Sequence, residues 1–161
     1  VLPMTTSATN DDPRWCPFCN PDPQRVFLRL RHVFALWDGF PVTDGHALIV
    51  PYRHVPTWFD ASHTERAELF SAIDAVCSII RERSGIDGFN FGVNVGAAAG
   101  QTVPHLHQHV IPRRNGDMPD PRGGVRHVIP GKGNYLITHD PPRGPSIAHR
   151  SRGSGCSCHP W

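Results

Sequence analysis

The sequence lacks the features of a membrane or exported protein. Its 161 residues contain no apolar run of the length that crosses a bilayer and no pattern typical of a cleaved leader. Charge of one sign is also scarce, since 16 basic and 14 acidic residues leave a net charge of +2. Dedicated nucleic-acid-binding domains usually carry a strong basic excess. We therefore expect a cytoplasmic protein that has no membrane partner and whose main ligand is not a nucleic acid.

Cysteine is sparse and odd in number, with five residues in the chain, which argues against a disulfide framework. Two of them belong to Cys16-Pro17-Phe18-Cys19, where the two-residue spacing allows both thiolates to bind one tetrahedral zinc ion. A redox-active pair is the alternative, although the sequence does not predict the helix that follows such a pair in a thioredoxin-like unit. Near the C-terminus, Cys156, Cys158 and His159 form either a second metal cluster or part of a flexible tail.

One domain is predicted between two irregular ends. Residues 1–14 are polar and contain prolines, and residues 141–161 are rich in Pro, Gly, Ser and Arg. Residues 15–140 are enough for a single domain with its own core. Apolar patterns predict strands over residues 26–30, 33–37, 46–50, 89–95 and 105–111. Several strands and only one long helix favour an α+β fold with an antiparallel β-meander sheet.

The long helix is predicted over residues 64–83. Ser62 and Glu65 have the spacing of a capping box, in which each side chain bonds to the other residue's backbone. Gly85 then supplies a stop signal. Apolar residues recur at helical spacing between these limits, namely Leu69, Phe70, Ile73, Val76, Cys77 and Ile80. This stripe is expected to pack on the sheet or on a partner subunit.

The most informative stretch is Pro104 to Pro112, which places histidines at positions 105, 107 and 109. In a β-strand alternate side chains share a face, so these imidazoles would lie together while Gln108 points the other way. Apolar residues would fill a core at lower cost, and imidazole can act as nucleophile, proton carrier or metal ligand. The pattern therefore favours chemistry over its alternatives, which are a solvated polar face and a tag-like cluster.

This His-x-His-x-His run resembles the signature of the histidine triad superfamily of nucleotide hydrolases and transferases. The segments Gly45–Pro51 and Asn94–Pro104 also resemble the strand and the lead-in that accompany the triad. The likeness is to a zinc-bearing bacterial branch that includes dinucleoside polyphosphate hydrolases. It implies an antiparallel sheet with one long helix and a shorter one. It also implies hydrolysis at a nucleoside α-phosphate through a covalent nucleotidyl-histidine intermediate. A nucleoside phosphoramidase and a non-catalytic nucleotide-binding module are the alternatives.

The resemblance assigns roles to individual residues. His107 would be the nucleophile, His109 would donate to a phosphoryl oxygen, and His46 would bond within the histidine cluster. Related phosphorylases have glutamine in place of the last histidine, which this chain keeps. Asp38 matches the position that receives the ribose hydroxyls. Three positions match residues near the phosphate, namely Asn94, Thr102 and Gln101. Phe18, together with Trp37, could form an apolar slot for the base.

The resemblance also completes the metal site and suggests an assembly. It adds His54 and His105 to Cys16 and Cys19 as ligands of a structural zinc ion, leaving His105 outside the chemistry. Members of the superfamily are commonly homodimers joined through helix and sheet, so a homodimer with a small nucleotide as its substrate is expected.

Overall fold

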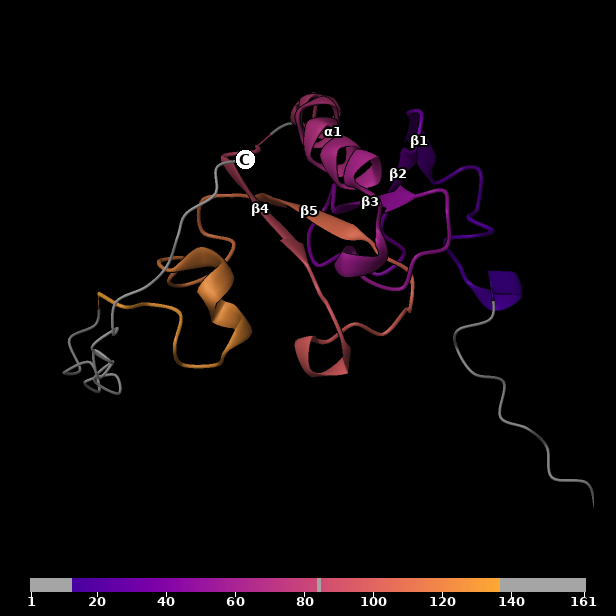
Figure 1. Ribbon diagram of the computed structural model, residues 1–161. Coiled ribbons are helices and arrows are strands. Elements are labelled where there is room, and N and C mark those ends of the chain that lie inside the picture. Colours follow the sequence, from indigo (N-terminus) through magenta and orange to yellow (C-terminus); the bar gives the residue numbers. More distant parts are fainter. Residues whose placement is uncertain (1–12, 84, 137–161) are drawn as a thin grey trace, which may run out of the picture.

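The computed structural model describes residues 13–83 and 85–136, and within them the chain forms one five-stranded antiparallel sheet (Figure 1). The strands lie in the order β1-β2-β3-β5-β4. Their bounds are β1 Val26–Arg29, β2 Val33–Trp37, β3 Ala47–Pro51, β4 Gly88–Val93 and β5 Gln108–Arg113. The first three strands form the predicted meander. β5 then inserts beside β3 and leaves β4 at the edge, so the α+β prediction is confirmed.

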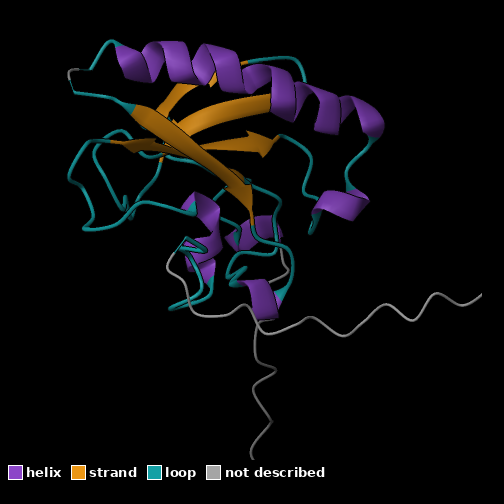
Figure 2. Cartoon of the chain, turned by 90° about the vertical axis from the view of Figure 1, so that its left-hand side faces the viewer, coloured by secondary structure: helices purple, strands orange, loops and turns teal. Residues whose placement is uncertain are grey.

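Helix α1, His63–Arg81, covers one face of the sheet (Figure 2). It begins as predicted, because the Ser62 hydroxyl accepts from the backbone N–H of Glu65 and the Glu65 carboxylate accepts from that of Ser62. The helix ends two residues before the predicted limit, and Gly85 follows with a φ of 76°. The shorter helical elements are 3₁₀ turns, namely η1 Pro13–Trp15, η2 Trp58–Asp60, η3 Ala97–Ala99 and η4 Gly124–Val128. η2 lies beside the start of α1, where Trp58 packs against Phe70 of the helix, and the other three lie on the other side of the sheet (Figure 2).

The two faces of the sheet bury different sets of residues. Under α1 lies the larger core, in which Ile49, Val110 and Leu106 pack against Leu69 and Val76 of the helix. The opposite face carries a smaller cluster that joins Phe34, Leu36, Leu48 and Val50 to Cys16 and Phe18. This second cluster fixes the N-terminal segment against the sheet beside the histidines.

The histidine run is not one continuous strand, which corrects the prediction of a strand over residues 105–111. β5 begins at Gln108, so only His109 of the three histidines lies in the strand. The backbone N–H of Leu106 donates instead to the carbonyl of Val55, at 2.7 Å, and that of His105 donates to Val103. Pro104, just before, has no N–H to offer a neighbouring strand. The alternation of faces nevertheless holds, since Leu106 and Val110 are buried under the helix.

No helix in the described part of the chain is long and apolar enough to cross a membrane. Residues 1–12 of the predicted arm, the predicted tail 141–161 and its Cys156, Cys158 and His159 lie outside the described residues.

An ion pair ties the start of α1 to the segment after β3. The Arg53 guanidinium donates to both carboxylate oxygens of buried Glu65, at 2.7 and 3.0 Å. Hydrogen bonds from Arg53 lower the pKa of Glu65 from 4.5 to about 2. A carboxyl whose pKa is lowered by folding stabilises the protein above its unfolded pKa and loses this contribution as the pH falls through its folded pKa.

We therefore predict that Glu65→Gln lowers the free energy of unfolding at pH 7 by about 1.5–3 kcal/mol, the contribution of hydrogen bonds to a charged group. The difference from wild type should shrink between about pH 4.5 and pH 2. Urea denaturation at pH 7 and pH 3 measures it. Glu82→Gln, at the exposed far end of the same helix, is the control. An equal loss at both pH values would contradict the ion-pair explanation.

Candidate active site

The orientation of His107 is fixed by a backbone carbonyl. Its Nδ1 lies 2.7 Å from the carbonyl oxygen of His105, so Nδ1–H donates and Nε2 keeps its lone pair. The side chain is 7% exposed. Phe18 packs against the ring, with 4.9 Å between centroids. The geometry therefore presents an oriented imidazole with one free nitrogen, which is the requirement for a nucleophilic histidine.

A second arrangement links three elements beside His107. His109, at 5.1 Å between ring centroids from His107, has its Nδ1 3.0 Å from Nε2 of His46. Nδ1 of His46 in turn lies 3.2 Å from a carboxylate oxygen of Asp38. The backbone N–H of Val42 donates to the same Nδ1 at 3.4 Å, so the proton of His46 lies on Nε2 and is donated to Nδ1 of His109. His109 then carries its own proton on Nε2. The series ends on a negative charge that stabilises a proton taken up by either ring.

Burial keeps these histidines neutral. It lowers the pKa of His107, and it lowers the pKa of His46 although Asp38 opposes the shift. For His109, burial and the neighbouring His107 and His46 lower the pKa to about 4. Near pH 7 all three are therefore uncharged imidazoles. A neutral imidazole keeps a lone pair on one ring nitrogen, and this lone pair is free to attack a phosphorus atom.

Four other side chains gather where the N-terminal segment meets the histidine run. The potential ligand atoms of Cys16, Cys19, His54 and His105 all lie within 4.8 Å of one another. Sγ of Cys16 lies 3.3 Å from Nδ1 of His105, and Sγ of Cys19 lies 3.2 Å from Nδ1 of His54. Tetrahedral zinc, with bonds of about 2.3 Å to sulfur and 2.0 Å to nitrogen, places such atoms about 3.5 Å apart. Both the donor set and the spacing fit zinc.

Two further observations characterise this cluster. Nε2 of His105 lies 2.9 Å from the Pro51 carbonyl, a bond that directs Nδ1 toward the cysteines and resembles the outer contacts of metal-bound histidines. Burial, and then the neighbouring Cys16, raise the pKa of the Cys19 thiol to about 11. Redox-active pairs instead have lowered thiol pKa values. The surroundings thus do not favour the redox interpretation of the Cys-x-x-Cys motif.

A cavity of about 610 Å³ opens beside the catalytic candidates. His46 and His109 line one part of it together with Asn94. Its size lies in the range of small-molecule sites, about 300–1,000 Å³.

The family model of the HIT domain matches residues 20–116, more than half of the chain. The chain belongs to the HIT domain family. It is 36% identical over 94 residues to a bis(5'-nucleosyl)-tetraphosphatase (asymmetrical) of Schizosaccharomyces pombe, covering 58% of this chain and 52% of that protein. It is 39% identical over 93 residues to an AP-4-A phosphorylase of Mycobacterium tuberculosis, covering 57% and 48%. The chain thus spans about half the length of these curated relatives.

Among solved structures, a Zn-bound histidine triad family protein from Mycobacterium smegmatis is similar to this HIT domain. The TM-score is 0.60 at 32% sequence identity, and the likeness covers 68% of this chain and 86% of that chain. A HIT family protein from Bacillus anthracis gives a TM-score of 0.59 at 32% identity, covering 63% and 75%.

The HIT domain brings most of the predicted site residues together. Asp38, Asn94 and Phe18 lie near the histidines, as described above. Thr102 and Gln101 instead line a separate hollow of about 310 Å³. The Gln101 amide donates to the carbonyls of Pro56 and Val103 and accepts from Gly96 N–H. Its hydrogen bonds therefore hold the loop before the histidines in place. Their contacts with substrate stay predictions.

Trp37 does not form a base slot with Phe18, which corrects that suggestion. It stacks on Phe27 at 4.0 Å between centroids and packs with the core under α1. Phe18 belongs to the cluster on the opposite face. The two aromatic rings are therefore separated by the sheet, because odd-numbered residues of β2 face the helix.

The sequence predicted no role for the segment after β5, yet η4 in this segment forms one wall of the cavity. Val125, His127 and Val128 line it opposite the histidines. The sequence Gly123-Gly124 signals a tight turn before these residues, but no sequence pattern shows that the turn folds back over β4.

Proposed function

We propose that this HIT domain is a nucleotidyl hydrolase that cleaves dinucleoside polyphosphates at a nucleoside α-phosphate. The observation that carries the proposal is the bond from Nδ1–H of His107 to the His105 carbonyl, which leaves Nε2 as the only nitrogen with a free lone pair. His109 and His46, which are beside it, can supply and receive a proton.

The reaction has two displacements. Nε2 of His107 attacks the α-phosphorus, a nitrogen–phosphorus bond forms, and the bond to the leaving polyphosphate oxygen breaks. Water then attacks the same phosphorus, the nitrogen–phosphorus bond breaks, and a nucleoside monophosphate leaves with the imidazole restored. His109 donates to a phosphoryl oxygen, and the series through His46 to Asp38 stabilises its proton. Positioning and charge neutralisation supply most of the acceleration in such transfers.

The proposed contacts with substrate follow the site geometry. Asn94 lines the cavity beside His109 and is assigned to the phosphate. Asp38 is assigned to the ribose hydroxyls. One of its oxygens faces His46 and the other accepts from Phe40 N–H, and each oxygen retains lone-pair capacity for a further donor. Phe18 packs against the His107 ring and is assigned to the apolar contact with the base.

The similar proteins support the substrate class but differ in the acceptor. One relative is named a tetraphosphatase and another a phosphorylase. The presence of His109, where the phosphorylase pattern has glutamine, favours water as the acceptor here. Hydrolysis of diadenosine tetraphosphate yields AMP and ATP, whereas phosphorolysis yields ADP and ATP. The same nucleophile would also cleave an adenosine phosphoramidate, which makes a phosphoramidase the second candidate.

We predict that the protein releases AMP and ATP from diadenosine tetraphosphate, and that His107→Ala lowers turnover at least about a thousandfold because no covalent intermediate forms. Chromatography of products, with an adenosine phosphoramidate run in parallel, measures both branches. His63→Ala, at the start of α1, is the control and should keep its activity.

Three outcomes would revise the proposal. Release of ADP in the presence of phosphate would indicate a phosphorylase, and turnover of the phosphoramidate alone would indicate a phosphoramidase. Tight nucleotide binding with no turnover of either compound would indicate a nucleotide-binding module.

We also propose that Cys16, Cys19, His54 and His105 hold a structural zinc ion. All four ligand positions would be protein side chains, so the ion would stabilise the N-terminal segment beside the histidines and would not bind substrate. Thiolate ligands are consistent with the reducing conditions of the cytoplasm, where we expect the protein to reside.

We predict one zinc ion per chain by elemental analysis of protein purified without chelator. Cys19→Ala should lose the metal and lower the melting temperature, because folding and metal binding are coupled. Cys77→Ala is the matched control, since Cys77 is also a free cysteine but lies in the core under α1. Wild-type protein without zinc, or Cys19→Ala with a full complement, would contradict the site.

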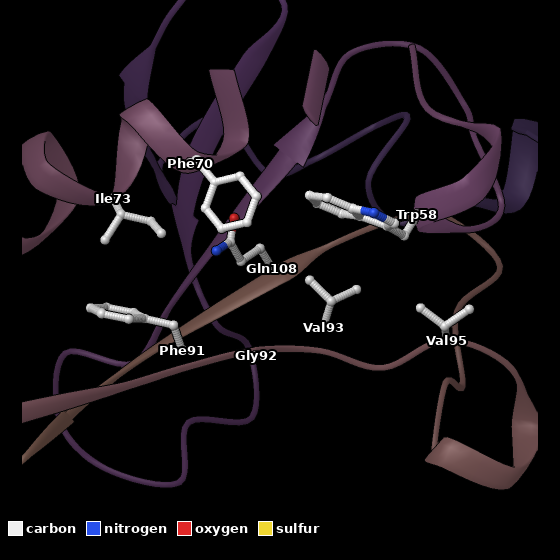
Figure 3. Close-up of a pocket in the computed structure, with 8 residues that line it drawn as sticks. All are labelled: Trp58, Phe70, Ile73, Phe91, Gly92, Val93, Val95 and Gln108. Atoms are coloured by element: carbon white, nitrogen blue, oxygen red, sulfur yellow. The ribbon is translucent and has the colours of Figure 1, made fainter. Parts of the chain in front are cut away.

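We further propose a homodimer joined through the α1 side of the sheet. A hollow of about 320 Å³ lies there, lined by Trp58, Phe70, Ile73, Phe91, Val93 and Val95, with Gln108 at its floor (Figure 3). Phe70 and Phe91 are 60% and 40% exposed. Gln108 is 4% exposed and its Oε1 has no hydrogen-bond partner. Edge strand β4 borders the hollow with unpaired backbone groups, which a second copy can pair.

We predict that wild type sediments as a dimer and that Phe91→Glu shifts it to monomer, because the new carboxylate would be buried without a partner. Phe40→Glu, at a 92% exposed position in the loop after β2, should leave the dimer intact. Sedimentation velocity over a range of concentrations measures the shift. A wild-type monomer at every concentration would overturn the assembly.

A further inference from the structure

The cavity beside the histidines extends well beyond them. It passes from His46 and His109 across β4 and β5 to the 3₁₀ turn η4, Gly124–Val128. Between the two ends lie Asn90 and Ile111, which pair across β4 and β5. A phosphate held at His107 and His109 would occupy one end only. The remaining volume has room for a further part of the substrate.

The floor of the cavity is open next to His109. Gly92 pairs with His109 across the two strands, and a Cβ built on Gly92 would meet no atom within 4 Å. A glycine inside a strand often marks a place where a ligand approaches the backbone closely. Asn90 follows two residues along the same face. Its Oδ1 accepts from Arg113, and its Nδ2 lies toward Gly124. The amide thus offers a donor within the cavity.

The far wall is apolar and exposed. Val125 and Val128 are 58% and 78% exposed, and both line the cavity. Their turn is held by bonds of its own loop. The Arg126 guanidinium donates to the Gly133 carbonyl, and His127 Nε2 lies 3.0 Å from the Arg122 carbonyl. Gly123 has a φ of 95°, and a Cβ there would lie 2.0 Å from the Gly133 oxygen. These hydrogen bonds and this close approach therefore fix the conformation of the turn that forms the wall.

We propose that η4 and Asn90 form a subsite for the second nucleoside of the substrate, the half that leaves with the polyphosphate. The flat base would pack on Val125 and Val128, and Asn90 Nδ2–H would donate to a base acceptor. This inference rests on the proposed function, because it names the leaving half of the same substrate. The attacked nucleotide would lie beyond the end marked by His46 and His109, with its ribose at Asp38, which adjoins His46.

The test compares two ligands that differ only in the second nucleoside, diadenosine tetraphosphate and adenosine 5'-tetraphosphate. Calorimetric titration is done in the His107→Ala background, so that neither compound is consumed. The variant is Val125→Ser with Val128→Ser. The matched control is Ile129→Ser, which changes a 59% exposed residue of the same segment that does not line the cavity.

We expect the double variant to weaken binding of diadenosine tetraphosphate about tenfold, as for lost contacts in an apolar pocket, and binding of adenosine tetraphosphate less than twofold. The control should change neither. Equal weakening of both ligands would place the attacked nucleoside on η4 and overturn the assignment. Unchanged affinity for both would show that η4 is not a subsite. Failure of the hydrolase proposal would appear separately, as absent turnover by wild type.

Discussion

The hydrogen bonds of His105 are the constraint on which the site depends. Its carbonyl oxygen accepts from Nδ1–H of His107 and so leaves the free lone pair of that ring on Nε2. Its ring donates to Pro51 at the end of β3 and directs its other nitrogen to Cys16. One residue thus joins the proposed nucleophile, a strand end and the N-terminal cysteines. A shift of His105 would misorient His107, so the proposed zinc ion would help to orient the proposed nucleophile indirectly.

The sheet places the proposed chemistry and the proposed dimer interface on opposite faces. Along β5, His109 faces the cavity whereas Gln108 and Val110 face the helix. The period of a strand is two, so a slip of one residue in the β5 register would exchange these faces. The six pairs with β4 hold the register against such a slip. Edge strand β4 therefore serves both sides, since Phe91 and Gly92 line both the cavity and the apolar hollow, with the Phe91 side chain in the hollow (Figure 3).

How much the sequence predicted depended on the range of the interactions. The start of α1 was correct because its capping box lies within four residues. The strand at the histidines was wrong in extent because Leu106 and the His105 ring bond to the distant end of β3 and the segment after it. The cysteine–histidine cluster joins residues 35 and 89 positions apart. Spacing within one segment could suggest Cys16 and Cys19, but only the family resemblance supplied His54 and His105.

The wall at η4 also escaped prediction, because β4, against which it packs, lies far away in the sequence. The histidines are positioned by β3, β5 and the core on both faces, so changes there would disturb packing. The η4 turn is held by the bonds of its own loop, from Asp120 to Asn134. Substitutions in this loop therefore need not disturb the sheet. On the proposed assignment, the core fixes the positions of the histidines, whereas the contacts with the leaving nucleoside lie in a segment that can change independently.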